Sequence, residues 1–162
     1  MRLSDLPWTD LILEVEGIPV LSLKTILHPN DCSEHSKTAL HHASALAKDS
    51  GARLVLLYVK APQETVIGEF GTPPPEEEPT DEAYLKMLGT LVPADARFTV
   101  ECVVAEGRPT DEILRVAKEM KVDLIVLGGH KHSWLGRLLA GDVAEEVIRG
   151  AGCPVVTVRS PD

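Results

Sequence analysis

The chain has 162 residues, of which 44% are apolar and 25% charged, and this composition suits a single globular domain with one core. A net charge of −9 at pH 7 argues against a nucleic-acid partner, because binding the phosphate backbone needs a basic stripe. No apolar run reaches the roughly 18 residues of a membrane span. Acidic residues also interrupt the N-terminal stretch where a signal peptide would be apolar.

The first predicted strand of the core is a short apolar run near residues 24–28. A helix follows over 33–51, with Ser33 as its N-cap and Gly51 as its stop. The continuous apolar run near 53–59 predicts a strand that is buried on both faces.

The second half of the chain continues the same rhythm. The alternating segment near 98–104 predicts a strand close to a sheet edge, and 109–120 predicts a helix with proline and acidic residues at its start. A buried strand near 123–128, a helix over 142–150 and a last strand near 154–158 complete the pattern. This strand–helix–strand alternation predicts an α/β fold, a doubly wound parallel sheet with helices on both faces.

Two segments stand outside this rhythm. Residues 61–88 begin with a Pro/Gly/Glu-rich loop, which we expect to be exposed and mobile to about residue 80, and end in a helical stretch. Residues 1–23 precede the domain at 24–162 and read either as a hairpin or as an extended arm.

Two loops follow strands at the expected carboxyl edge of the sheet, where doubly wound folds bind ligands. They are "HPNDCSE" (28–34) and "GGHKHSWLGRLLAGD" (128–142). Gly128 would let a ligand approach the backbone closely, and Gly141 stands just before a helix start that favours phosphate. The alternative for each glycine is a plain tight turn.

Four blocks of the chain resemble the universal stress protein (UspA) family, in matching order and spacing over residues 24–159. They are "ILHPNDCSEHSKTAL", "AKDSGARLVLLYV", "EGRPTDEILRVAKEMKVDLIVLGGH" and "RLLAGDVAEEVIRGAGCPVVTVR". The resemblance implies a five-stranded, Rossmann-like sheet of order 3-2-1-4-5, and usually a dimer. The nucleotide-binding members carry Gly-x-x-Gly, nine residues, and then Gly-Ser or Gly-Thr, which hold the phosphates of ATP.

The resemblance also implies which residues would bind a nucleotide, ATP or AMP with Mg²⁺. Asp31 matches the aspartate near the adenosine, Val59 the residue near the adenine, and Gly128 and Gly141 the first and last glycines of the motif. Two positions depart from the pattern: the second glycine is Lys131, and the Ser/Thr position is Asp142.

The aspartate at 142 alters the site more than the fold. Asp142 caps a helix as well as serine does, so the helix start is kept. Its negative charge, about 4 Å from a phosphate, would cost roughly 1–4 kcal/mol of binding.

Lys131 has two opposite effects. At a positive φ it costs roughly 1 kcal/mol or moves the loop, but its ammonium could also contact a phosphate or pair with Asp142. We therefore expect a phosphate loop in which ATP binding is weakened or modified.

A metal site and a redox sensor are the alternative sites that the sequence offers. His130 and His132, with His28, form only a weak metal pattern without a completing carboxylate or cysteine. Cys32 stands at a predicted helix start, where a lowered pKa would suit a redox sensor, but no second cysteine is near in sequence to resolve it, which favours a simple role as a small residue.

The other two cysteines, Cys102 and Cys153, lie far from Cys32 and form no Cys-x-x-Cys pair, so no disulfide framework or zinc site is predicted. Reduced thiols fit a cytoplasmic protein.

Three function classes remain open. The first is a stress-response or signalling module, with or without a bound adenine nucleotide, and the second is an enzyme such as a slow ATPase or a nucleotidyl transferase. No assembled base and nucleophile pair supports catalysis, and "HPND" lacks the His-x-Gly-His signature of nucleotidyl transferases. The third is a structural dimerisation domain. The apolar last strand invites pairing with a second copy through Val155, Val156, Thr157 and Val158.

Overall fold

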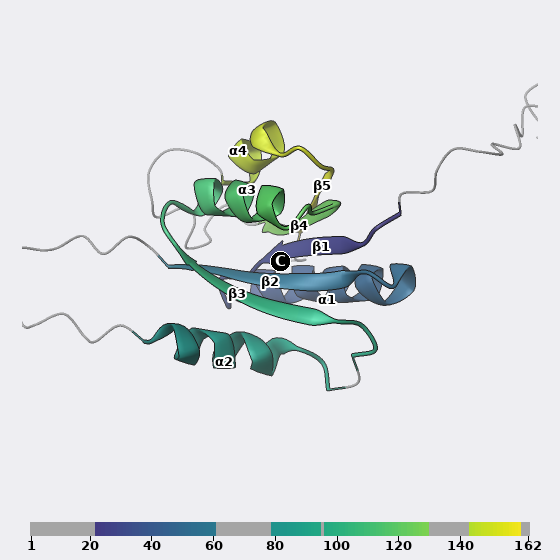
Figure 1. Cartoon of the computed structure of the whole chain (residues 1–162), viewed down its shortest axis with the longest axis vertical. Coiled ribbons are helices and arrows are strands. Elements are labelled where there is room, and N and C mark those ends of the chain that lie inside the picture. The colour runs from purple at the N-terminus through teal and green to yellow at the C-terminus, as the bar shows by residue number, and fades with distance from the viewer. Residues whose placement is uncertain (1–21, 61–78, 95, 130–142, 160–162) are drawn as a thin grey trace, which may run out of the picture.

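The computed structural model describes residues 22–60, 79–94, 96–129 and 143–159 (Figure 1). Most of the N-terminal extension and most of the loop expected up to residue 80 lie outside the described residues. The hairpin or arm and the mobile loop therefore stay predictions.

A five-stranded parallel sheet forms the centre of the molecule. Its strands are β1 (Thr25–Pro29), β2 (Arg53–Lys60), β3 (Val100–Glu106), β4 (Leu124–Gly129) and β5 (Val155–Arg159). They lie in the order β3-β2-β1-β4-β5, which confirms the predicted fold. The two strands expected near an edge, β3 and β5, are the edge strands.

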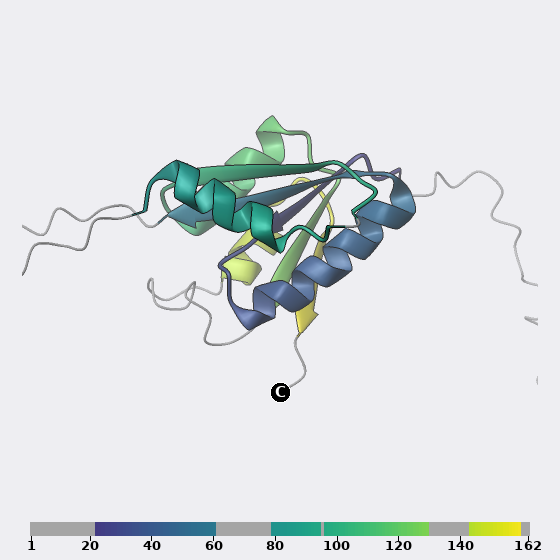
Figure 2. The same cartoon turned by 90° about the horizontal axis from the view of Figure 1, so that it is seen from below.

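Helices cover both faces of the sheet, as Figures 1 and 2 show. They are α1 (Glu34–Ser50), α2 (Asp81–Leu91), α3 (Pro109–Glu119) and α4 (Val143–Gly150). Helices α1 and α2 pack on one face, and α3 and α4 on the other. The caps of α1 are those predicted: the Ser33 side chain accepts from the Ser36 amide, and Gly51 adopts φ 71°.

The core consists of two apolar layers, one on each side of the sheet. Along β2, Leu54 and Leu56 pack towards α1, while Val55, Leu57 and Val59 pack towards α3 and α4. Burial of one such side chain contributes about 1.5–3 kcal/mol. Burial on both faces is why the inner strands read as continuous apolar runs rather than as alternating ones.

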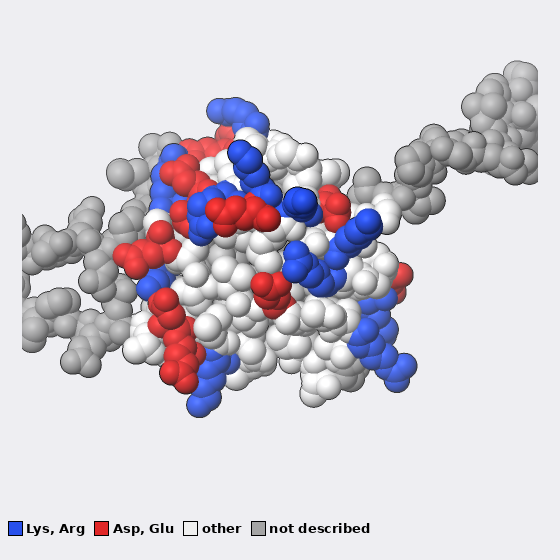
Figure 3. All heavy atoms as spheres, in the orientation of Figure 1, with Lys and Arg blue, Asp and Glu red and all other residues white. Residues whose placement is uncertain are grey.

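The molecular surface over α3 carries charges of both signs. Acidic and basic side chains lie side by side over α3 (Figure 3), where Arg115 pairs with Glu112 and Glu119. None of the described helices is long and apolar enough to cross a membrane.

Candidate functional site

The candidate site lies at the carboxyl edge of the sheet, where the strand order reverses. β1 pairs with β2 on one side and with β4 on the other, so this edge carries the topological switch point. Asp31 follows β1, Val59 lies near the end of β2 and Gly128 near the end of β4. The structure therefore brings these three predicted residues onto neighbouring strand ends.

The other predicted site residues, Lys131, Gly141 and Asp142, lie outside the described residues. The side chain of Val59 is 3% exposed and packs in the core beneath α3 and α4. The Val59 side chain is therefore part of the hydrophobic core.

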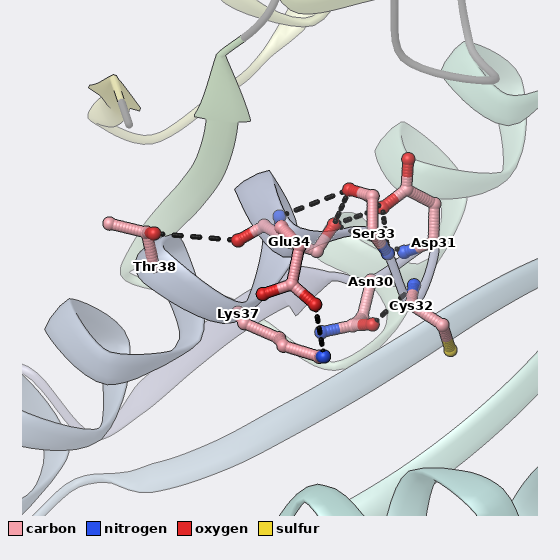
Figure 4. A network of polar contacts seen from close by, with 8 residues as sticks. Asn30, Asp31, Cys32, Ser33, Glu34, Lys37 and Thr38 are labelled. Carbon is pink, nitrogen blue, oxygen red and sulfur yellow. Dashed lines mark hydrogen bonds and ion pairs between the residues drawn. The ribbon is translucent and has the colours of Figure 1, made fainter. Parts of the chain in front are cut away.

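The Asp31 carboxylate is fixed from one side. Its Oδ1 accepts from the Ser33 amide at 3.1 Å and the Ser33 hydroxyl at 2.6 Å, and the Ser36 hydroxyl also donates to it. The second carboxylate oxygen points away from these donors (Figure 4). The charged acceptor is therefore held in place by α1's first turn and presents one oxygen outward.

Asn30 shapes the turn that carries this aspartate. Its main-chain amide donates to the Leu57 carbonyl at 2.8 Å, and its side-chain Oδ1 accepts from the Cys32 amide at 2.7 Å. Cys32 adopts φ 62°, the left-handed region that costs a non-glycine residue about 1 kcal/mol. The surrounding hydrogen bonds hold this conformation.

His28 connects the turn to β4 from inside the protein. The ring is fully buried, with Nδ1 2.9 Å from the Val126 carbonyl oxygen and Nε2 3.1 Å from the Asn30 side-chain amide. A carbonyl oxygen only accepts, so Nδ1 carries the proton and Nε2 accepts from Asn30. Burial lowers the pKa of His28, which favours this neutral form.

These contacts weaken the metal hypothesis. Both ring nitrogens of His28 are occupied, while His130 and His132 lie outside the described residues. Within the described ranges no group of three or more His, Cys, Asp or Glu side chains could hold a metal ion.

The surroundings of Cys32 disfavour a redox sensor. Burial raises the pKa of the thiol, and the nearby charge of Asp31 raises it further. The thiol lies 3.7 Å from the thioether sulfur of Met87 on α2. Cys32 is therefore a protonated, half-buried packing residue.

A second polar cluster, which the sequence did not reveal, joins α3 to α4. One guanidinium nitrogen of Arg108 donates to both oxygens of Glu146, at 2.8 and 2.7 Å, and the Thr110 hydroxyl donates to Glu146 at 2.8 Å. The partners stand 36 and 38 residues apart, so no local pattern connects them. The Ser36 and Asn30 contacts were also missed, although short polar runs such as "NDCSEHS" are typical of such turns.

Comparison with known proteins gives consistent matches along the chain. The model of the universal stress protein family matches residues 22–159. Universal stress protein MJ0577 of Methanocaldococcus jannaschii is 31% identical, covering 84% of this chain and 94% of its own length. Universal stress protein MJ0531 of the same organism is 33% identical, and the match covers 85% of this chain and 83% of the relative's length. A crystal structure of a universal stress protein in complex with cAMP matches with a TM-score of 0.63 and 25% identity. The match covers 86% of this chain and 99% of that protein's chain.

The buried histidine predicts a loss of stability in mild acid. Unfolding returns the His28 pKa from its lowered value to about 6.5, so below that pH the unfolded chain binds the additional proton. Below about pH 6.5, the free energy of unfolding should decrease as the pH is lowered. His28 contributes at most ~1.4 kcal/mol per pH unit to this decrease. Urea unfolding at a series of pH values between neutral and mildly acidic measures the slope.

Two variants assign that slope. His28→Gln should remove this contribution, whereas His41→Gln, on the exposed face of α1, should keep it. Equal slopes in wild type and His28→Gln would show that His28 does not titrate on unfolding.

Proposed function

The chain belongs to the universal stress protein family, and on that premise we propose that it binds an adenine nucleotide, ATP or AMP, at the carboxyl edge of its sheet. The observation that carries the proposal is the Asp31 carboxylate, fixed through Oδ1 at the switch point with its second oxygen pointing outward. The cAMP complex of a similar protein supports this choice of ligand class.

The chemistry of the edge suits a nucleoside with a phosphate. The outward oxygen of Asp31 would accept from a ribose hydroxyl or an exocyclic amino group, which are neutral donors that a charged acceptor binds well. Gly128 has no side chain to obstruct the approach to β4, and the amino end of α4 favours negative charge. Val59 would meet the base through main-chain atoms, because its side chain is buried. Mg²⁺ would accompany a triphosphate.

The phosphate loop differs from that of the ATP-binding members at Lys131 and Asp142. We propose that it still holds phosphate but that the charge of Asp142 weakens or modifies ATP binding. Gly141 stands two residues before the start of α4 in the sequence, and a glycine there would let phosphate approach the helix amides.

A stress-response or signalling module fits the described residues better than an enzyme. His28 has no free ring nitrogen to act as a base, and the raised pKa of Cys32 leaves it a poor nucleophile. A slow ATPase is the alternative, and sustained release of phosphate from ATP would favour it. The three free cysteines fit a reducing compartment, and we propose the cytoplasm.

Replacing the loop aspartate tests the altered phosphate loop. Asp142→Ser should strengthen ATP binding by roughly 1–4 kcal/mol, because serine keeps the helix cap and removes the repulsion. Adenosine, which has no phosphate, should gain much less. Calorimetric titrations with ATP-Mg²⁺ and adenosine measure both affinities.

Lys131→Gly and the double variant separate the two departures from the motif. Most of the gain should come from Asp142→Ser alone. If wild type already binds ATP at low micromolar concentration and Asp142→Ser changes nothing, Lys131 has rebuilt the site and the charge argument fails.

We also propose a homodimer that pairs through β5. This strand is a sheet edge; Val155 and Val158 are partly exposed, Thr157 is exposed, and Val156 is 41% exposed. An apolar edge strand of this kind favours pairing with a second copy.

A charge on the edge strand should dissociate this dimer. Val156→Glu would place like charges close together across a two-fold interface, and we expect a monomer by light scattering at tens of micromolar. Leu85→Glu is the matched control, because Leu85 is 39% exposed on α2, away from β5, and should leave the dimer intact. A wild-type monomer, or equal dimerisation in both variants, would contradict the proposal.

A further inference from the structure

Helix α4 depends on its tertiary contacts for its position. It has eight residues, about two turns, and helices this short gain little stability from their own hydrogen bonds. Val143 and Val147, one turn apart, are buried in the core beneath it. These two side chains bury the inner face of the helix, but apolar contacts have little directionality, so they define its orientation less sharply than hydrogen bonds do.

Glu146 adds a directional contact between α4 and the start of α3. Its carboxylate accepts from Arg108 through both oxygens and from Thr110 through Oε2, all within 2.8 Å. Thr110 is 4% exposed, so its contact with Glu146 is shielded from water, whereas the Arg108 side chain is 59% exposed and its contact lies at the surface. Arg108 and Thr110 belong to the start of α3, a helix that packs firmly through several buried residues.

The carboxylate also lies beside the start of α3. The N-cap residue Arg108 makes no side-chain capping hydrogen bond, and Pro109 follows at the first helical position. A negative charge near this end is favourable because it opposes the helix dipole. Glu146 therefore joins the amino ends of two helices on the same face of the sheet.

We propose that Glu146 is a positioning residue for phosphate binding, which holds the amino end of α4 in the place where its amide groups meet the phosphate. This inference rests on the proposed nucleotide function. Arg108 and Thr110 act through Glu146 and do not touch the ligand. A displacement of the helix by a fraction of an ångström would weaken hydrogen bonds to phosphate but not those to the nucleoside at Asp31.

Positioning and simple electrostatics predict opposite changes in ATP affinity when the Glu146 carboxylate is removed. Removing a carboxylate from α4 reduces the repulsion of an anionic ligand, so electrostatics alone predicts tighter ATP binding. Loss of positioning predicts weaker ATP binding although the charge has become more favourable.

Glu145 provides the matched control on the same helix. Among the described residues it pairs within α4, with Arg149 one turn later, and both side chains are well exposed. Glu145→Gln and Glu146→Gln remove the same charge from neighbouring positions, and only the second breaks a contact to α3.

Titration of ATP and adenosine into these variants tests the inference. Glu146→Gln should weaken the binding of ATP roughly 3- to 10-fold relative to that of adenosine. Glu145→Gln should leave the affinity for ATP unchanged or slightly increased. Thr110→Val should lower the ratio of ATP affinity to adenosine affinity, as Glu146→Gln does. Adding Arg108→Gln to Glu146→Gln should lower this ratio little further, because Arg108 and Glu146 act together. An unchanged ratio of ATP to adenosine affinity in Glu146→Gln would overturn the proposal.

Hydrogen exchange without ligand separates this inference from the nucleotide function. Amides of α4 should exchange several-fold faster in Glu146→Gln than in Glu145→Gln. If they do not, positioning by Glu146 is wrong whatever the protein binds. If they do, but wild type binds neither ATP nor adenosine, Glu146 positions α4 while the phosphate role and the proposed function both fail.

Discussion

The arrangement of the candidate site depends on one buried hydrogen bond, from the His28 ring to the Val126 carbonyl. It joins β1 to β4 at the point where the strand order reverses, and the other ring nitrogen accepts from Asn30. Asn30 in turn shapes the turn that carries Asp31. A polar ring in an apolar layer is costly unless both nitrogens are paired, so this bond and the turn support each other.

The sheet, its order and most element boundaries could be predicted because they follow from periodic patterns and from a family resemblance. The run at 53–59 is apolar throughout because β2 is buried on both faces, and Ser33 and Gly51 have the chemistry of caps. The polar contacts of the site were not predictable in the same way. Glu146 meets Arg108 only after α3 and α4 are packed together, and no spacing in the sequence records such a contact.

Charge sets the character of the proposed phosphate site. The protein as a whole is acidic, and the loop aspartate at 142 would add repulsion close to the ligand. Glu146 adds another carboxylate within α4, but its charge is matched by Arg108 at the start of α3. Under these two proposals a carboxylate would oppose phosphate binding at position 142 and support it at position 146, where Arg108 and Thr110 hold it.

The most direct test of nucleotide binding at this edge is a calorimetric titration of AMP into wild type, Asp31→Asn and Asp49→Asn. Asparagine at 31 can keep the acceptor that bonds Ser33 while replacing the outward oxygen by a donor. Asp49 is exposed near the end of α1, so its variant matches the change in charge alone. We expect a loss of about tenfold or more in AMP affinity for Asp31→Asn and none for Asp49→Asn. Equal AMP affinity in all three proteins would contradict nucleotide binding at Asp31.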